Sequence, residues 1–308
     1  MNHPGPADEL GPPLATARSG FPRETSSLGG GRATPGNRTA ERIRAYYREF
    51  DEWGRLVQDP YHRLEFETTI HYLRRYLPSR GVLLDAGGGP GRYTIELARD
   101  GYEVVLLDFS PEQLDQARRN VRRAGVSNMV REIVSGSIVD LSQFARSSFD
   151  AVLCLGGPLN HVLPARRRET AIGELARVAR TGAPIFISVI GRYSALTDGV
   201  LRHPDGLRTD PQHHRRILRT GDYDGHRGFA PCHFYRPEDL VRSVRRHRLR
   251  VEEVVGLEGL GAYHVREMNR LARSDPEAWA SWQEFHLQTC VDPAVVATSE
   301  HFLVVARK

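Results

Sequence analysis

One stretch constrains the fold of this chain more than any other: residues 82–91, which read VLLDAGGGPG. An apolar run stops at Asp85, and a loop with glycine at alternate positions follows. Such a run predicts a parallel strand that is buried on both faces of a sheet. The glycines permit a tight turn and leave no Cβ between the backbone and a ligand. The stretch therefore predicts a strand that ends at a ligand the size of a nucleotide.

The spacing of the glycines separates two classes of ligand. The dinucleotide fingerprint G-x-G-x-x-G sets a pyrophosphate on a helix N-terminus. Starting at Gly87, that pattern needs glycine at position 92, which is Arg92. The sequence instead reads D-x-G-x-G-x-G from Asp85 to Gly91. This form resembles motif I of the class I S-adenosylmethionine (SAM)-dependent methyltransferases, and the resemblance implies that the loop holds the methionine end of SAM.

A second acid follows where a ribose contact is expected. Residues 101–108 read as another buried strand, which ends at Asp108, about 20 residues after the glycine loop. A carboxylate suits the two vicinal hydroxyls of a ribose because each of its oxygens accepts hydrogen bonds. A helix is predicted to begin next, with Ser110 as N-cap, Pro111 at the first helical position and Gln113 completing a capping box.

The resemblance covers about residues 80–190 and implies an α/β fold with a Rossmann-like, doubly wound sheet of seven strands. The segments outside this range, at the N-terminus and at two strand ends, predict a helical N-terminal lid and cap insertions. It also implies SAM as cofactor and S-adenosylhomocysteine (SAH) as product. At the family's third acidic position Ser137 stands in place of the usual aspartate. The residues expected to bind the cofactor are Asp85, Ala86, Gly87, Gly88, Gly89, Gly91, Tyr93, Asp108, Phe109, Ser110, Ser137, Ile138, Leu155 and Gly156.

Three regions are expected along the chain. Residues 1–38 are rich in Gly, Pro, Ser and Thr, which predicts a disordered tail. Residues 39–78 carry aromatic side chains at helical spacing, which predicts a helical lid. Residues 79–308 form the methyltransferase domain, with cap insertions at about 191–236 and 261–292. Beyond the first two strands, we expect strands at 129–134, 149–155, 183–190, 251–255 and 299–306, and helices at 166–180, 237–247, 263–272 and 276–290.

The loop after the fourth strand is where this class of enzyme holds the methyl donor against its acceptor. Asn160 and His161 supply the only polar side chains of that loop, so they are the candidate catalytic residues. An imidazole titrates near neutral pH, which makes His161 a candidate general base. The alternative is that it caps a helix or packs against the sheet. Candidate substrate contacts are Tyr46, Tyr61, His233 and Tyr235, with a place in the core as the alternative for the tyrosines.

Composition excludes several other classes. The net charge of +5 on 308 residues does not require a nucleic-acid partner, and no apolar run approaches the ~20 residues of a membrane span, so we expect a cytoplasmic protein. The three cysteines show no paired spacing. Histidines crowd residues 203–233, but no carboxylate or cysteine stands at a recognisable ligand spacing from them, so no metal site is predicted.

The sequence therefore predicts a SAM-dependent methyltransferase that acts on N or O of a small molecule, such as a secondary metabolite. Two alternatives stay open. Arginine-rich segments at 202–216 and 242–250 suit a peptide or RNA substrate, and an intact loop with Asp108 is also compatible with a SAM-binding regulatory protein that lacks turnover.

Overall fold

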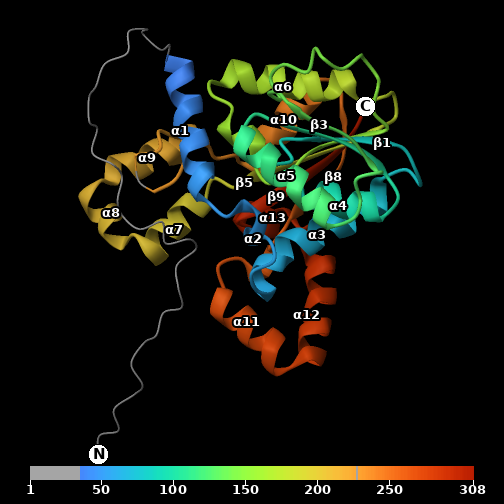
Figure 1. The fold of residues 1–308 in the computed structure, drawn as a ribbon. Helices are drawn as coiled ribbons and strands as arrows, with labels where there is room; N and C mark the ends of the chain where they lie inside the picture. The colour runs from blue at the N-terminus through green and yellow to red at the C-terminus, as the bar shows by residue number, and fades with distance from the viewer. Residues whose placement is uncertain (1–34, 227) are drawn as a thin grey trace, which may run out of the picture.

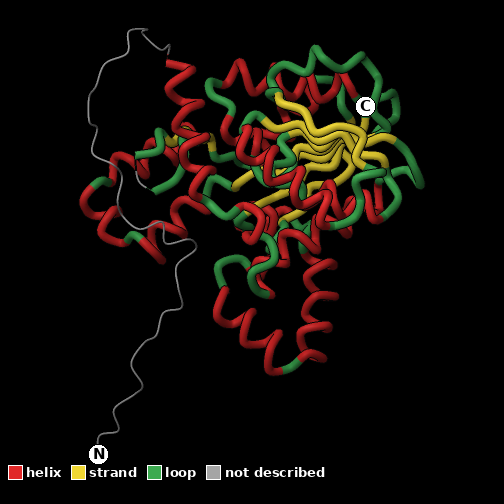
Figure 2. Tube along the Cα trace, in the orientation of Figure 1, coloured by secondary structure: helices red, strands yellow, loops and turns green. Residues whose placement is uncertain are grey.

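The computed structural model describes residues 35–226 and 228–308. Within them a seven-stranded sheet runs through the centre of the molecule, with helices on both of its faces (Figures 1 and 2). The strand order is β3-β2-β1-β4-β5-β9-β8, and the strands from β1 to β5 pair in parallel. β9 is antiparallel to both of its neighbours. In sheet order the strands are β3 (Val130–Ser135), β2 (Glu103–Asp108), β1 (Val82–Ala86), β4 (Ala151–Cys154), β5 (Pro184–Ile190), β9 (His301–Arg307) and β8 (Arg250–Gly256).

The central strands are mostly apolar because both faces of the sheet are covered. Successive side chains of a strand point to opposite faces. Leu83 accordingly packs in one core cluster and Leu84 in another, and both are fully buried. The predicted α/β sheet is confirmed, and its mixed character comes from β9, which enters between β5 and β8.

Helices of the central domain separate onto the two faces. α3 (Pro60–Tyr76) and α4 (Arg92–Arg99) cover one face, and α6 (Ala165–Val178) and α10 (Pro237–Arg246) cover the other (Figure 1). α5 (Pro111–Arg123) packs against β2 and β3. The remaining short elements of this part are α2 (Glu52–Arg55), α13 (Pro293–Thr298) and the 3₁₀ helices η1 (Pro158–His161) and η2 (Gly259–Gly261).

The N-terminal helix α1 spans Pro35–Glu49, so it begins before the predicted position 39. The predicted disordered tail lies, for residues 1–34, outside the described residues. α1 packs against α5 and stands beside the helices of the first insertion (Figure 1). One contact fixes it there: Gln113 Nε2 donates to the Tyr47 carbonyl at 2.9 Å. Gln113 therefore does not close the predicted capping box, although Ser110 Oγ does accept from the Gln113 backbone N–H.

The first insertion contains more regular structure than predicted. It forms α7 (Ser194–Arg202), α8 (Pro204–Thr209) and α9 (Pro211–Thr220), followed by a two-stranded hairpin of β6 (Asp222–Tyr223) and β7 (Cys232–His233). Its helices lack a clear apolar stripe, since Val200 and Leu201 are exposed, which is why periodicity did not reveal them. Sequence signals exist for α8 and α9 only: each has proline at its first position, and Asp210 is the N-cap of α9.

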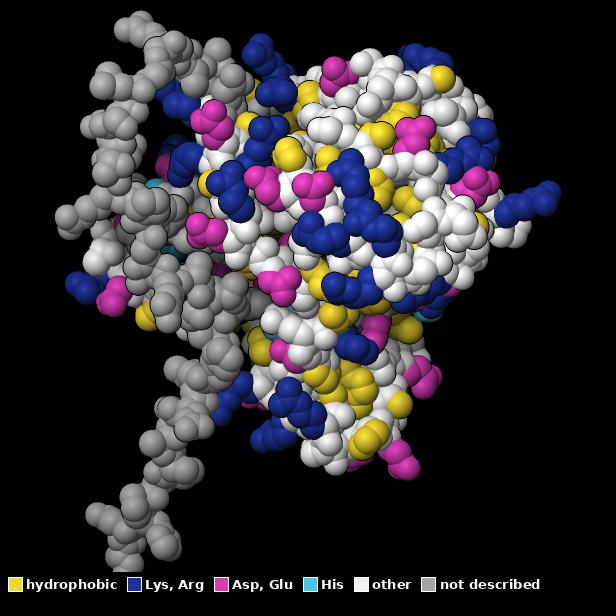
Figure 3. Space-filling model, viewed as in Figure 1, with side chains coloured by type: hydrophobic (Ala, Val, Ile, Leu, Met, Phe, Trp, Pro, Cys, Tyr) yellow, Lys and Arg dark blue, Asp and Glu magenta, His cyan; other side chains and the backbone are white. Residues whose placement is uncertain are grey.

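The second insertion is the helix pair α11 (Val265–Ser274) and α12 (Pro276–Thr289), close to the predicted ranges. It projects from the sheet as a separate lobe, where hydrophobic side chains gather on the surface (Figures 1 and 3). Elsewhere on the face shown in Figure 3, arginine side chains are interspersed with acidic ones. Among the described residues, no helix has both the length and the apolar character needed to cross a membrane.

Candidate active site

The glycine loop is held against the end of β2 by its own backbone. The N–H groups of Gly87 and Gly88 both donate to the Leu107 carbonyl, at 2.7 and 3.1 Å. Gly87 has a φ of +86°, and a Cβ there would lie 2.4 Å from Pro158 Cγ. Glycine is therefore required at this position by both backbone conformation and space. The loop brings the chain after β1 against the loop after β4, which contains Pro158.

Asp108 joins the glycine loop to the end of β2. Its Oδ2 accepts from the Gly89 N–H at 3.0 Å, and its Oδ1 accepts from the Ser110 N–H at 2.9 Å. The side chain is buried, and that burial raises the pKa of its carboxyl, while the hydrogen bonds from the backbone oppose the shift. Each oxygen keeps a further lone pair. Asp108 can therefore accept hydrogen bonds from a ligand without releasing the loop.

A cavity of about 390 Å³ lies at the carboxyl ends of β1, β2 and β4. This is the edge at which open α/β sheets bind ligands, and the volume falls in the range of small-molecule sites. α1 contributes Thr39, Ala40, Ile43 and Tyr47 to its wall. Most of the predicted cofactor residues line it: Gly87, Gly88, Gly89, Tyr93, Asp108, Phe109, Ser110, Ser137, Ile138, Leu155 and Gly156.

Three of the predicted cofactor residues lie outside the cavity wall: Asp85, Ala86 and Gly91. Asp85 is buried behind the loop, where its Oδ2 accepts from Thr94 Oγ1 at 2.6 Å and lies against Gly88. Burial raises the pKa of this carboxyl to about 6. Its position differs from the prediction because the strand turns the side chain into the protein, so Asp85 supports the loop from behind.

Asn160 also differs from its predicted role. Its side chain is fully buried, its Nδ2 donates to the His233 carbonyl at 2.7 Å, and its Oδ1 accepts from the Ile190 N–H at 3.1 Å. Both ends of the amide are therefore occupied by backbone groups. Asn160 ties η1 to β5 and β7, and it has no place on the cavity wall among the described residues.

His161 does line the cavity, and its ring is held at both nitrogens. Nδ1 lies 2.9 Å from the Pro231 carbonyl, which only accepts, so Nδ1 carries the proton. Nε2 then accepts from the Tyr47 hydroxyl at 2.8 Å. Burial lowers the pKa of His161 to about 4. His161 is therefore a neutral acceptor at neutral pH, which argues against the predicted general base.

The four predicted substrate residues lie away from the cavity wall. Tyr46 stacks on Phe50 at 5.3 Å between ring centroids. Tyr61 donates to Glu300 at 2.9 Å. His233 pairs with Asp222 at 2.7 Å, and its ring contacts that of Tyr235, which is buried. The cavity receives Tyr47 instead of Tyr46, because neighbouring helix positions point in different directions.

Two charged residues on α2 also line the cavity, and neither was predicted from the sequence. Glu52 and Arg55 both line the cavity, with Arg55 Nε donating to Glu52 Oε1 at 3.1 Å. Burial raises the pKa of the Glu52 carboxyl. Glu52 lies close to both Gly89 and Gly156, within 4 Å of where a Cβ would stand at each. The i,i+3 spacing of the pair was visible in the sequence, but nothing local distinguished it from a solvated helix face.

A buried network of charged residues that do not line the cavity holds Arg55 in place. Glu65 accepts from both terminal nitrogens of Arg55, and His301 Nδ1 lies 2.7 Å from Glu258 Oε1 and 3.6 Å from Glu65. The neighbouring carboxylates raise the pKa of His301 to about 9 against the opposing effect of its burial. Arg55 and His301 lower the pKa of Glu65 to about 2, again against burial. The network fixes α2, and with it the charged part of the cavity wall.

The cavity fits a SAM-like ligand on features of its own. Gly89 has φ +51°, and the nearest atoms to its missing Cβ are 3.8 Å away, so the loop leaves open space. Gln113 Oε1 is buried at the cavity without a hydrogen-bond partner, although an amide oxygen accepts two bonds. Both observations indicate that a polar ligand completes this wall.

Comparison with known proteins agrees with this fit. Residues 83–182 match the family model described as a methyltransferase domain. Residues 83–182 thus carry a methyltransferase domain of the class I SAM-dependent type. SAM is the cofactor of this class.

Individual curated relatives match parts of the chain. It is 32% identical over 160 residues to a glycine/sarcosine N-methyltransferase of Parasynechococcus marenigrum (strain WH8102), covering 50% of this chain and 53% of the relative. It is 38% identical over 120 residues to a ubiquinone biosynthesis O-methyltransferase of Hahella chejuensis (strain KCTC 2396), covering 39% of this chain and 47% of the relative. The chain thus spans about half the length of these two curated relatives.

Solved structures share the fold of this chain over most of its length. One is the 1,6-didemethyltoxoflavin-N1-methyltransferase of Burkholderia thailandensis, solved with 1,6-didemethyltoxoflavin and SAH. Its TM-score is 0.52 at 17% identity, and the match covers 91% of this chain and 93% of that one. At this identity the likeness speaks for the fold alone.

Proposed function

We propose that this methyltransferase transfers the methyl group of SAM to N or O of a small-molecule acceptor enclosed beneath α1. The observation that carries the proposal is one continuous cavity. It joins the Gly87–Gly89 loop and Asp108 to the hydrogen-bonded pair Tyr47 and His161. Cofactor and acceptor can therefore meet in a single cavity.

The cofactor end of the cavity has a group for each polar part of SAM. Asp108 is positioned to accept from the ribose hydroxyls, and Ser137 and Ile138 lie where the adenine is expected. Glu52 offers a carboxylate to the ammonium of the amino-acid end. Arg55 uses three of its five N–H donors on Glu52 and Glu65, which leaves donors for the carboxylate of that end.

The acceptor end is largely apolar. Val162, Leu163 and Pro164 follow His161 in the wall, and Ile43 of α1 also lines the cavity. The Tyr47 hydroxyl donates to His161, so its oxygen is directed to accept an N–H or O–H from the acceptor. Such a wall suits a small molecule with an apolar body and one polar group.

When bound, SAM supplies an activated methyl group on a sulfonium centre. The protein's task is then to position the acceptor and to exclude water. Tyr47 holds the acceptor's hydrogen through its oxygen, and His161 holds Tyr47. Since burial lowers the pKa of His161 to about 4, its imidazole is a weak base, which argues against proton transfer from the acceptor to this residue. The proposal therefore favours an acceptor whose lone pair is available at neutral pH, such as an unprotonated amine.

The names of two relatives indicate a class of acceptor. One is a glycine/sarcosine N-methyltransferase, and the other is a ubiquinone biosynthesis O-methyltransferase. Both names describe small acceptors methylated on N or O. We extend this class of acceptor to the present chain. The expected cytoplasmic location stays a prediction.

Methyl-labelled SAM tests the proposal. The purified protein is incubated with it and with a cell extract separated into small-molecule, peptide and RNA fractions. The expected result is label in the small-molecule fraction, and much less label with an Asp108→Ala variant at the same SAM concentration. Label confined to peptide or RNA would contradict the proposal in favour of a polymer substrate. Intact SAH binding with no label in any fraction would favour a binding protein without turnover.

A further inference from the structure

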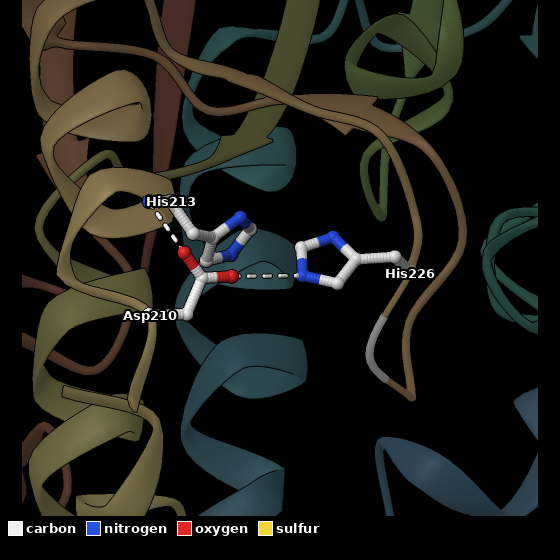
Figure 4. A group of neighbouring side chains, drawn as sticks. All are labelled: Asp210, His213 and His226. Carbon is white, nitrogen blue, oxygen red and sulfur yellow. Dashed lines mark hydrogen bonds and ion pairs between the residues drawn. The ribbon is translucent and has the colours of Figure 1, made fainter. Parts of the chain in front are cut away.

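Three side chains of the first insertion converge outside the active-site cavity: Asp210, His213 and His226 (Figure 4). Their ligand atoms all lie within 4.8 Å of one another. Asp210 caps α9, and its Oδ1 accepts from the His213 backbone N–H at 3.1 Å. His213 therefore stands on the first turn of the same helix. His226 comes from the loop between β6 and β7 and points its ring toward both residues (Figure 4).

The ring of His226 is oriented by a second carboxylate. Its Nδ1 lies 2.5 Å from Asp224 Oδ1, and Arg216 holds the other oxygen of Asp224 at 2.7 Å. Because a carboxylate accepts, Nδ1 is the donor, and the lone pair of the ring then lies on Nε2. Nε2 faces Asp210 Oδ2 at 3.4 Å. Histidine ligands of metal ions are held in this way, with a carboxylate on the nitrogen that does not bind the ion.

Two further observations suit an ion at this point. His213 Nδ1 is buried and has no hydrogen-bond partner. Two ligand atoms about 2.0–2.1 Å from a tetrahedral Zn²⁺ are separated by about 3.3 Å. The separation of 3.4 Å between Asp210 Oδ2 and His226 Nε2 matches this distance between two zinc ligands. For an octahedral ion with similar bond lengths, two neighbouring ligand atoms would be separated by about 3.0 Å.

We propose that Asp210, His213 and His226 bind a divalent transition-metal ion, with Zn²⁺ as the best fit. Two imidazoles and one carboxylate are ligand types that zinc accepts, and water would complete a tetrahedral set. This departs from the prediction of no metal site. That prediction depended on ligand spacing, whereas the fold brings His226 to α9 from a separate hairpin.

The ion would act on the shape of the active site without contacting the substrate. The loop that carries His226 also holds α1, since Arg42 Nη2 donates to the Gly225 carbonyl at 2.7 Å. Phe229 of the same loop contacts the Tyr46 ring at 5.2 Å, and the Pro231 carbonyl fixes His161. A metal ion that joins α9 to this loop would therefore order the wall that contains Tyr47 and His161.

Zinc titration of the full chain tests the proposal. Untagged protein is freed of metal with EDTA, and ZnCl₂ is added in calorimetry and in thermal unfolding. We expect one Zn²⁺ per chain and a rise in Tm. His226→Ala should weaken binding by more than about 100-fold and remove the rise in Tm, and Asp224→Asn should weaken it by about 10- to 100-fold. His203→Ala is the matched control, because this exposed histidine belongs to the same insertion and lies outside the cluster.

A loss of zinc binding can be distinguished from a loss of folding. Circular dichroism and SAH binding show whether each variant is folded, and Asp210→Asn replaces His226→Ala if the latter is not. Replacement of zinc by Co²⁺ should give the visible absorption of a tetrahedral site in the parent protein and in His203→Ala. Failure of the parent protein to bind Zn²⁺, or equal binding by His226→Ala and Asp210→Asn, would overturn the proposal. Methyl transfer is not needed for any of these measurements, so they are independent of the proposed function.

Discussion

The hydroxyl of Tyr47 donates to Nε2 of His161 across 2.8 Å, and this bond connects α1 to the loop after β4. The opposite nitrogen of His161 is bound to the Pro231 carbonyl, so the first insertion holds the same ring. Three segments far apart in the sequence thus meet at one imidazole. The acceptor wall of the cavity depends on all three.

Removal of the Tyr47 hydroxyl should impair turnover and spare cofactor binding. Tyr47→Phe keeps the ring but leaves His161 Nε2 without its donor. We expect kcat/KM to fall by about tenfold, in line with the loss of one buried hydrogen bond, while the Kd for SAH is unchanged. Steady-state kinetics and calorimetry measure the two quantities. Tyr46→Phe is the matched control, and equal losses in both variants would contradict the assigned role of Tyr47.

The pH dependence of turnover tests whether His161 is a base. Its pKa is lowered to about 4 by burial, so the ring stays neutral at any pH well above that value. We expect the profile of kcat/KM above pH 5 to keep its shape in His161→Gln, even if its height falls. An acidic limb near pH 6.5 that disappears in His161→Gln would show that His161 takes a proton during turnover.

Asp108→Ala should weaken SAH binding by roughly 10- to 100-fold, the range expected for the loss of hydrogen bonds to a charged group. The loop N–H of Gly89 also loses its acceptor, which adds to the effect. Calorimetric titration with SAH gives the affinity. Asp115→Ala on the exposed face of α5 is the control and should bind as the parent protein does. Parent-like affinity of Asp108→Ala would remove this residue from the ribose site.

The buried network predicts a loss of stability at alkaline pH. The pKa of His301 is raised to about 9, above its usual value, so its contribution is complete below about pH 6.5 and is lost as the pH rises through 9. This is worth on the order of 3 kcal/mol of unfolding free energy. Urea unfolding at a series of pH values should show the decline, and His301→Gln should lack it. His264→Gln, an exposed histidine, should decline like the parent protein.

Deletion of residues 1–34 should leave Tm within about 1–2 °C of the parent value, because a segment so poor in apolar residues has little to bury. Deletion of residues 1–50 removes α1 with Tyr47 and should abolish turnover. Differential scanning calorimetry and a methyl-transfer assay measure both. A large drop in Tm for the shorter deletion would show that the N-terminal segment packs against the domain.

The cofactor half of the site could be predicted because its signals are local. A strand, a glycine loop and an acid follow one another within residues 82–108, and the chain direction of parallel strands brings their ends to one edge. This arrangement places Gly87, Gly89 and Asp108 together at that edge. Asp85 was misplaced because the pattern gives the residue type at a strand end and not the direction in which its side chain turns.

The acceptor half could not be predicted in the same way. Tyr47, Glu52 and Arg55 reach the cavity through the packing of α1 and α2, which depends on contacts with segments far along the chain. The same holds for Asp210, which is separated from His226 by a helix and a strand. Long-range packing of this kind leaves no fixed spacing in the sequence.

A crystal structure of the complex with SAH would show directly whether this cavity holds the cofactor. The account predicts SAH in the cavity, with its ribose hydroxyls on Asp108, its amino-acid end beside Glu52 and Arg55, and its sulfur directed toward the space below Tyr47. SAH bound elsewhere, or with its sulfur directed away from Tyr47 and His161, would contradict the account.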